Sequence, residues 1–201
     1  MRLFRRHTKE NRHRGVLRAV AGWCLQYPDD SVLGKTELLR AALNEIADVP
    51  GRAELLRVLD HLDGPAPGEH YVEVFDRKPR RTLHLTWYTD GDTRRRGSSL
   101  AELRQYYREH GFEPAENELP DFLPVVLEFA AAADPGAADE LLARFRPGLE
   151  LLHRNLIKLG TPYQDAIAAV LATIAAAAAP PVPQPPRELV GLDPYPTGSA
   201  R

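Results

Sequence analysis

The amino-acid sequence predicts an all-α fold, a single-domain bundle of about seven to eight helices. Apolar residues recur at intervals of three and four along most of the 201-residue chain, which is the spacing of one helix face. Proline, glycine and aspartate punctuate these stretches where helices are expected to begin and end. Only one stretch alternates like a strand, and no second stretch of similar quality could pair with it. A chain of this length can bury a core without disulfides.

Three helices are expected in the first third of the chain. Each has an apolar stripe with polar residues opposite, and each ends at a residue that disfavours helix. The stripes are Val16, Val20, Trp23 and Tyr27 before Pro28; Leu38, Leu39, Ala42, Leu43 and Ile46; and Leu55, Leu59 and Leu62 before Asp63 and Gly64.

The middle of the chain is harder to interpret. Tyr71, Val74 and Phe75 have the spacing of a short helical turn. Residues 82–89 alternate in polarity, which is a strand pattern. We interpret them as helix because an unpaired strand would leave its backbone groups without partners.

Helix boundaries are clearer in the second half. Ser99 and Glu102 have the spacing of a capping box for a helix that runs through Tyr107 and closes at Gly111. Asp121 is expected to cap the next helix, which carries Val125, Val126 and Phe129 and ends near residues 134–136.

Two further helices complete the expected bundle. A long apolar stripe consists of Leu142, Phe145, Leu149, Leu152, Leu156 and Leu159. Pro147 should kink that helix and Gly160 should end it. The last helix places Tyr163, Ile167, Val170 and Ile174 on one face.

Composition divides the chain into three parts. Residues 1–12 form a basic N-terminal arm, and residues 13–179 form the helical domain. Residues 180–201 contain seven prolines and no apolar period, which predicts a disordered Pro-rich C-terminal tail.

Charge is distributed unevenly. Residues 1–18 carry seven Lys/Arg and one Glu, a net charge of +6. Residues 113–143 carry eight Asp/Glu and no Lys/Arg, a net charge of −8. Such blocks are usually solvated faces. The alternative is that the acidic block receives a basic, amphipathic segment of a partner.

The residue inventory does not favour catalysis, a metal or a cofactor. The seven histidines lack the spacing of a zinc site, and Cys24 on an apolar face is expected to be a packed thiol. Residues 88–97 contain two aspartates before three arginines, but lack the later Glu of a calcium loop and any stacking platform for nucleic acid. Glu118 and Asp121 could be paired carboxylates of a small hydrolase, yet no nucleophile accompanies them.

The chain is expected to work in the cytoplasm. One cysteine suits a reducing compartment, and the charged start MRLFRRHTKENRHR is not followed by the apolar segment of a secretory signal. The longest apolar run is too short and too rich in alanine and proline to insert into a membrane.

Two segments carry a family likeness. YVEVFDRKPRRTLHLTWYTDGDTRRRG (71–97) and LPDFLPVVLEFAA (119–131) resemble the NarJ-type chaperones of respiratory nitrate reductase, also called its delta subunits. WCLQYPDD (23–30) is similar to an early segment of that family. The likeness covers about residues 14–175. His84 and Trp87 stand where the family often has Tyr, and Pro147 interrupts a helix that is usually smooth.

The resemblance implies an all-helical fold related to the TorD-type chaperones, and a protein that is not an enzyme. It implies binding to the N-terminus of the nitrate reductase catalytic subunit, which is held ready for molybdenum cofactor insertion before membrane docking. Proteins that deliver the cofactor are further implied partners. A chaperone for another molybdoenzyme is the nearest alternative, and a plain helical scaffold is a third.

The partner-binding residues are inferred from the two segments and from the acidic block. Acidic side chains should steer a basic helix, and aromatic side chains should anchor it. The expected set is Tyr71, Phe75, Trp87, Tyr88, Asp90, Asp92, Glu118, Asp121, Phe122, Leu123 and Glu128.

Overall fold

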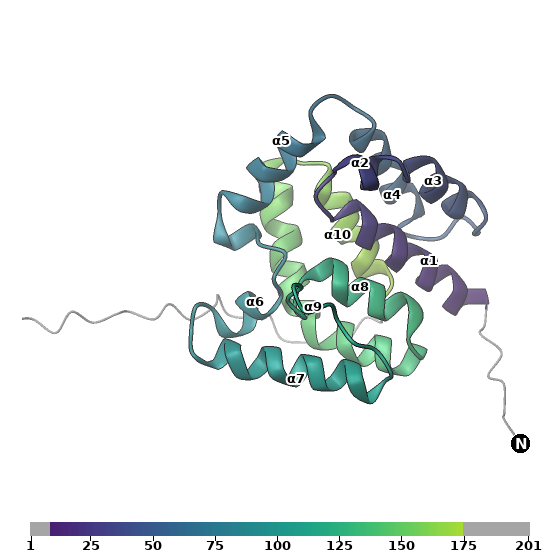
Figure 1. Cartoon of the computed structure of the whole chain (residues 1–201). Coiled ribbons are helices and arrows are strands. Elements are labelled where there is room, and N and C mark those ends of the chain that lie inside the picture. The colour runs from purple at the N-terminus through teal and green to yellow at the C-terminus, as the bar shows by residue number, and fades with distance from the viewer. Residues whose placement is uncertain (1–8, 175–201) are drawn as a thin grey trace, which may run out of the picture.

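The computed structural model describes residues 9–174, and within that range every regular element is helical (Figure 1). Seven α-helices span nine residues or more, which confirms the expected all-α bundle. They are α1 (Lys9–Cys24), α3 (Thr36–Asn44), α4 (Arg52–Leu62), α7 (Arg95–Glu109), α8 (Leu123–Ala132), α9 (Pro135–Leu159) and α10 (Tyr163–Ala172).

Shorter elements connect these helices. They are α2 (Asp30–Leu33), α5 (Pro67–Tyr71), a π-helical turn (Val72–Asp76), a 3₁₀ turn (Pro79–Arg81) and α6 (Thr86–Asp90). The predicted tail, residues 180–201, lies outside the described residues, as does most of the predicted N-terminal arm; α1 begins at Lys9.

The core lies where α1, α4, α8, α9 and α10 meet. α1 packs against α8, and α10 packs against α4 and α9. α1 lies close to α8 at Gly22, where an added Cβ would be in van der Waals contact with the Leu127 Cβ at 3.4 Å. The helices therefore enclose one continuous apolar cluster that includes fully buried Leu25, Leu59 and Ile167.

α9 confirms the long stripe predicted from the sequence as far as Leu156, but the last member of the stripe, Leu159, is 42% exposed in the final turn of the helix. Leu142, Leu149, Leu152 and Leu156 are each 0% exposed. Pro147 lies inside the helix, which continues from Pro135 to Leu159 without a break. The helix ends at Gly160, whose φ of 73° is the left-handed conformation that glycine adopts without strain.

Two helix boundaries and the burial of one leucine differ from the predictions. α7 begins at Arg95, so Ser99 and Glu102 lie within the helix and form no cap. α1 ends at Cys24, and Tyr27 beyond it is 52% exposed. Leu38, expected on an apolar stripe, is 68% exposed, because the face of α3 that turns toward the core carries Leu39 and Leu43.

We expect Gly148→Ala to lower the free energy of unfolding by about 1–3 kcal/mol, because α9 has no room for a methyl group there. A Cβ on Gly148 would lie 2.9 Å from the Tyr88 Cβ, which cannot move without the backbone of α6. The matched control is Gly97→Ala in α7, where no heavy atom lies within 4 Å. There the higher helix propensity of alanine should raise stability by up to about 1 kcal/mol. Urea unfolding measures both variants; a gain of stability in Gly148→Ala, like the gain expected for Gly97→Ala, would show that α9 is not packed tightly on α6.

Candidate functional site

The structure brings together two segments that are far apart in the sequence. Residues 83–85 run antiparallel to residues 121–123: Leu85 N donates to Asp121 O at 2.9 Å, and Leu123 N donates to Leu83 O at 2.9 Å. His84 and Phe122 form the isolated bridge between them. The interpretation of residues 82–89 as helix is therefore wrong for the residues before Thr86, which are extended and find a pairing partner in residues 121–123; it is right from Thr86, where helix α6 begins.

Asp121 is the polar centre of this junction and is 0% exposed. Its carboxylate accepts hydrogen bonds from Thr86 Oγ1 and, at 3.3 Å, from the Thr86 backbone N–H. His84 Nδ1 donates to it at 3.1 Å, and Arg96 Nη2 lies 3.4 Å from its Oδ2. Arg96 Nε also donates to Thr86 Oγ1 at 3.1 Å, so the network ties α6 and α7 to the start of α8.

The surroundings of Asp121 keep it ionised. Burial raises the pKa of this carboxyl group, but hydrogen bonds from His84 and Thr86 and the nearby charges of His84 and Arg96 outweigh burial and hold the pKa below its usual range. A carboxylate that accepts from His84 Nδ1 also fixes the His84 tautomer with its proton on that nitrogen.

Asp121 is not the helix cap that the sequence suggested. The N-cap of α8 is Phe122, and no side chain caps the helix. The carboxylate instead turns toward donors that lie 25 and 35 residues earlier in the chain. An Asp at the start of a helix is compatible with both roles, and only the fold distinguishes them.

Several expected partner-binding residues are buried in this conformation. Tyr71, Phe75, Tyr88, Asp90 and Leu123 are at most 7% exposed. The Tyr71 hydroxyl donates to Leu25 O at 3.1 Å, and the Phe75 ring packs on Tyr163 of α10 with ring centroids 4.9 Å apart. These side chains hold the bundle together and do not present a surface to a partner.

The other expected residues are accessible. Asp92, Glu118 and Glu128 are exposed, and Trp87 and Phe122 are half-buried. Sequence reasoning missed the exposed side chain of Leu119 (40% exposed), and it placed Tyr27 on an apolar helix stripe although that side chain is 52% exposed. Leu119 has no periodicity that could have indicated its exposure, since it lies in an acidic loop.

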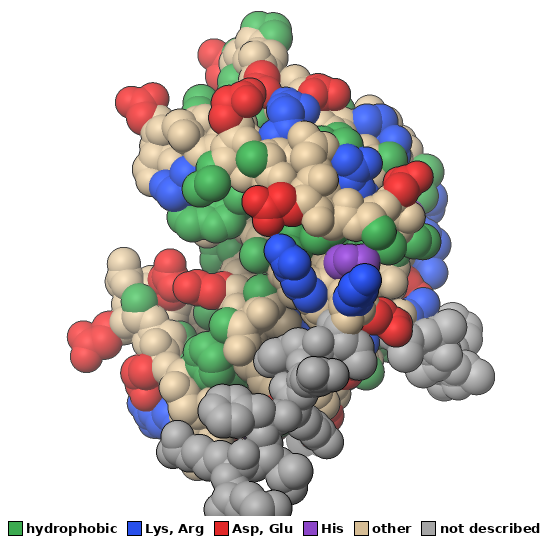
Figure 2. Space-filling model, turned by 90° about the vertical axis from the view of Figure 1, so that its right-hand side faces the viewer, with side chains coloured by type: hydrophobic (Ala, Val, Ile, Leu, Met, Phe, Trp, Pro, Cys, Tyr) green, Lys and Arg blue, Asp and Glu red, His purple; other side chains and the backbone are tan. Residues whose placement is uncertain are grey.

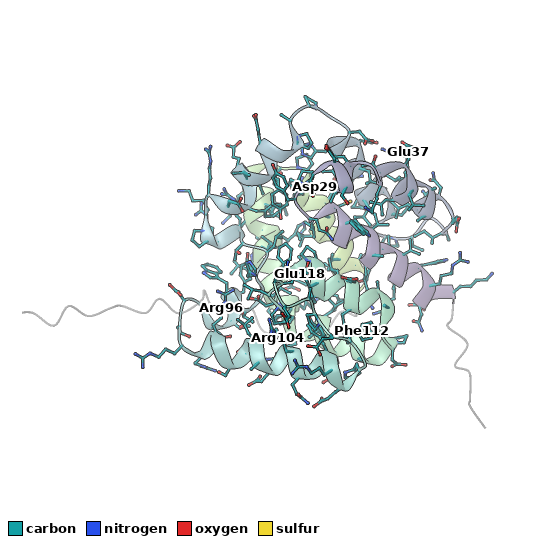
Figure 3. All side chains as sticks on the ribbon, viewed as in Figure 1. Asp29, Glu37, Arg96, Arg104, Phe112 and Glu118 are labelled. Atoms are coloured by element: carbon teal, nitrogen blue, oxygen red, sulfur yellow. The ribbon has the colours of Figure 1, made fainter. Side chains whose placement is uncertain are left out.

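Accessible acidic and apolar groups meet at a hollow in the molecular surface. Figure 2 shows it opening to the left, between an upper and a lower body, with hydrophobic side chains on both walls and acidic side chains along its lower edge. That side faces the viewer in Figure 3, where Asp29 lies above and Glu118 below. Glu118 belongs to the loop between α7 and α8, and Arg104 Nη2 contacts its backbone oxygen at 3.5 Å.

About half of the acidic block has structural partners. Glu113 pairs with Arg108 at 2.8 Å, and Asp139 pairs with Arg18 at 2.7 Å. Asp134 accepts from Gly136 N at 2.9 Å at the start of α9, and Asp121 is buried. The surface charge available to a partner is therefore smaller than −8, and Glu116, Glu118, Glu128 and Glu140 are its exposed members outside these contacts.

The geometry does not suit acid–base chemistry at Glu118 and Asp121, because Asp121 is enclosed by its donors and Glu118 is exposed on a loop. Burial raises the pKa of Cys24 to about 12, which makes its thiol a poor nucleophile. Among residues 9–174 no three His, Cys, Asp or Glu side chains are placed to hold a metal ion. No helix in that range is long and apolar enough to cross a membrane.

The structure is thus an all-helical bundle with an acidic, apolar-walled hollow beside a buried polar network of Asp121 with Thr86, His84 and Arg96, which we call the Asp121 lock. Comparison with known proteins identifies the class more closely. The family model described as "Nitrate reductase delta subunit" matches residues 38–169. This chain belongs to the nitrate reductase delta subunit family, as the resemblance of residues 71–97 and 119–131 predicted.

Individual relatives of this chain carry names that agree with the family match. The chain is 41% identical to the "Nitrate reductase-like protein NarX" of Mycobacterium tuberculosis over 159 residues, which are 79% of this chain and 24% of that protein. It is 33% identical to the "Probable nitrate reductase molybdenum cofactor assembly chaperone NarJ" of Bacillus subtilis, over 75% of this chain and 83% of that protein. It is 31% identical to NarJ of Escherichia coli K12, over 66% of this chain and 58% of that protein. The chain thus spans about a quarter of the mycobacterial relative.

Proposed function

We propose that this chain is an assembly chaperone for a respiratory nitrate reductase. It binds the N-terminal segment of the catalytic subunit and holds the apoenzyme competent for molybdenum cofactor insertion before membrane docking. The Bacillus subtilis and Escherichia coli relatives are named as molybdenum cofactor assembly chaperones, which supports the proposal. The same proposal places the protein in the cytoplasm, in contact with proteins that deliver the cofactor.

One observation carries the proposal: the two family-like segments pair with each other beside an open, acidic hollow. The Asp121 lock holds His84, which pairs with Phe122, and so it also holds the end of the loop between α7 and α8 that precedes Phe122. That loop presents Glu118 and Leu119 to solvent. A preorganised surface loses little conformational entropy when a partner binds.

The chemistry of this surface suits a basic amphipathic helix. Glu118 and Asp92 would steer it by charge, and Trp87, Phe122 and Leu119 would cover its apolar face. Tyr88 contributes from beneath, because its hydroxyl donates to Thr82 O at 2.9 Å and so holds the segment that leads to Trp87, whereas Tyr71 and Phe75 pack in the core against Tyr163.

Affinity capture tests the proposal. The full-length tagged chain, purified from a nitrate-respiring host, should retain the nitrate reductase catalytic subunit in its cofactor-free form. A catalytic subunit that lacks its N-terminal segment should not be retained. Retention of a different molybdoenzyme in its place would support the nearest alternative and overturn the choice of nitrate reductase.

We expect Glu118→Gln to weaken binding of a synthetic N-terminal peptide by about two- to fivefold at low salt, since a rim charge contributes modestly to affinity. The difference from the wild type should disappear at high salt, where exposed charges are screened. Glu37→Gln is the matched control, because Glu37 is an exposed acid on α3 and lies away from Glu118 in Figure 3. Calorimetric titration at two salt concentrations measures both variants. Equal affinities for the wild type and Glu118→Gln at low salt would remove Glu118 from the site.

A further inference from the structure

A second surface, formed by the 3₁₀ turn and the end of α9, is basic. Five cations gather there: Arg77, Lys78 and Arg80 before and within the 3₁₀ turn, and Arg154 and Lys158 on α9. All five are exposed. In Figure 1 the 3₁₀ turn lies on the left-hand side of the molecule between α5 and α6, and α9 packs against it.

The two segments are held side by side by a direct contact. Asn155 Nδ2 donates to Arg80 O at 2.8 Å. On a helix, residues four positions apart share a face, so Arg154 and Lys158 form one row next to the row of Asn155 and Leu159. The 3₁₀ turn is itself anchored from within, because Arg81 Nε donates to Val74 O at 2.6 Å.

These cations are not neutralised within the described part of the chain. Most arginines between residues 9 and 174 have a carboxylate or carbonyl partner, such as Arg57 with Asp165 or Arg40 with Asp60. Neither Asp nor Glu occurs between residues 77 and 89 or between 151 and 164. Of the nearest acids, Asp90 is buried, Glu150 pairs with Arg146 and Asp165 pairs with Arg57, which leaves Glu73 and Asp76 as the exposed acids beside the five cations.

Exposed apolar side chains accompany the charge. Leu159 and Ile157, in the last turn of α9, are 42% and 51% exposed and flank Lys158. A cluster of lysines and arginines with adjacent apolar side chains is the pattern that recognises an anionic lipid surface. An acidic protein segment would match the charge but would leave these two apolar side chains unexplained.

We propose that this basic face, formed by Arg77, Lys78, Arg80, Arg154 and Lys158, binds peripherally to membranes that contain anionic phospholipids. The positive charges lie against the headgroups while Leu159 and Ile157 touch the interface. No helix enters the bilayer. The acidic loop between α7 and α8 is a separate segment of the chain, so it would stay free to hold a polypeptide at the same time.

Vesicle co-sedimentation of the full-length chain tests the proposal. The wild type should bind vesicles of phosphatidylcholine mixed with phosphatidylglycerol at about 0.1 M salt, and should bind neither those vesicles at about 1 M salt nor pure phosphatidylcholine vesicles. The Arg154→Gln/Lys158→Gln double variant should bind at least about tenfold more weakly, with an unchanged thermal melt. Arg57→Gln/Arg108→Gln is the matched control, since it removes two cations whose side chains are each 53% exposed but lie elsewhere.

The basic N-terminal residues could also bind anionic vesicles, so they are tested with a separate variant. A variant with Arg2, Arg5 and Arg6 changed to Gln should retain the binding that the α9 variant loses. Loss of binding in the N-terminal variant with retention in the α9 variant would overturn the proposal. Binding to polyglutamate without binding to vesicles would also overturn it, and would assign this face to an acidic protein.

Discussion

Leu152→Ala should lower the free energy of unfolding by about 2–5 kcal/mol, the largest single effect that we expect from a core substitution. Leu152 is 0% exposed and lies at the centre of the α9 stripe, between Leu149 and Leu156. The loss combines the transfer free energy of the removed methyl groups with the cavity that remains among rigid neighbours. Leu156→Ala should behave alike. Equilibrium unfolding in urea measures both variants.

The same helix supplies the control. Ile157 follows Leu156 directly but is 51% exposed, so Ile157→Ala should change stability by no more than about 0.5 kcal/mol. A large cost at Ile157 with a small cost at Leu152 would mean that α9 is rotated about its axis relative to the structure described above.

Asp121→Asn should cost about 2–4 kcal/mol of stability, although the side chain keeps its shape. The substitution removes the charge that Thr86, His84 and Arg96 surround, and it leaves their donors facing a neutral amide. We expect a loss of stability in the lower part of this range, because the side chains of His84 and Arg96 are about one third exposed and water screens part of their charge.

The pH dependence of this variant gives an independent test. The folded-state pKa of Asp121 is held below its ordinary value, so its stabilising contribution is complete above about pH 4 and is lost as the pH falls through the lowered pKa. The stability difference between wild type and Asp121→Asn should therefore be constant near neutral pH and narrow in acid. Asp92→Asn, which changes an exposed loop carboxylate, should cost little at any pH. A difference that grows in acid would contradict the proposed lock.

Local periodicity was sufficient to predict most of the helices. Leu55, Leu59 and Leu62 lie on one buried face of α4, and Gly160 ends α9 as predicted. These features depend on residues within a few positions of one another, which is the range over which a sequence pattern carries information. The resemblance of residues 71–97 and 119–131 led to the correct family before any geometry was known.

The candidate site was only partly predictable, because burial depends on contacts between distant segments. Tyr71 and Phe75 were expected to be surface anchors, but both rings pack against Tyr163 of α10. Asp121 was expected to cap α8, whereas Thr86 and Arg96 turn its carboxylate inward. Leu119 was overlooked because an exposed leucine in an acidic loop has no local signature.

The two proposed surfaces divide the work of an assembly chaperone between them. The acidic hollow would hold a basic segment of the catalytic subunit, and the basic face would keep the complex near an anionic membrane. The Asp121 lock lies between them, because it ties the 121–123 segment to residues 84–86 and these continue from the basic 3₁₀ turn.

The most direct measurement of the proposed function is the molybdenum content of nitrate reductase in a host that lacks this chain. We predict that the catalytic subunit still accumulates but carries much less molybdenum per polypeptide than in the parent strain, and that the wild-type chain restores the metal content. Full molybdenum occupancy of the reductase in the absence of the chain would contradict a role in cofactor insertion.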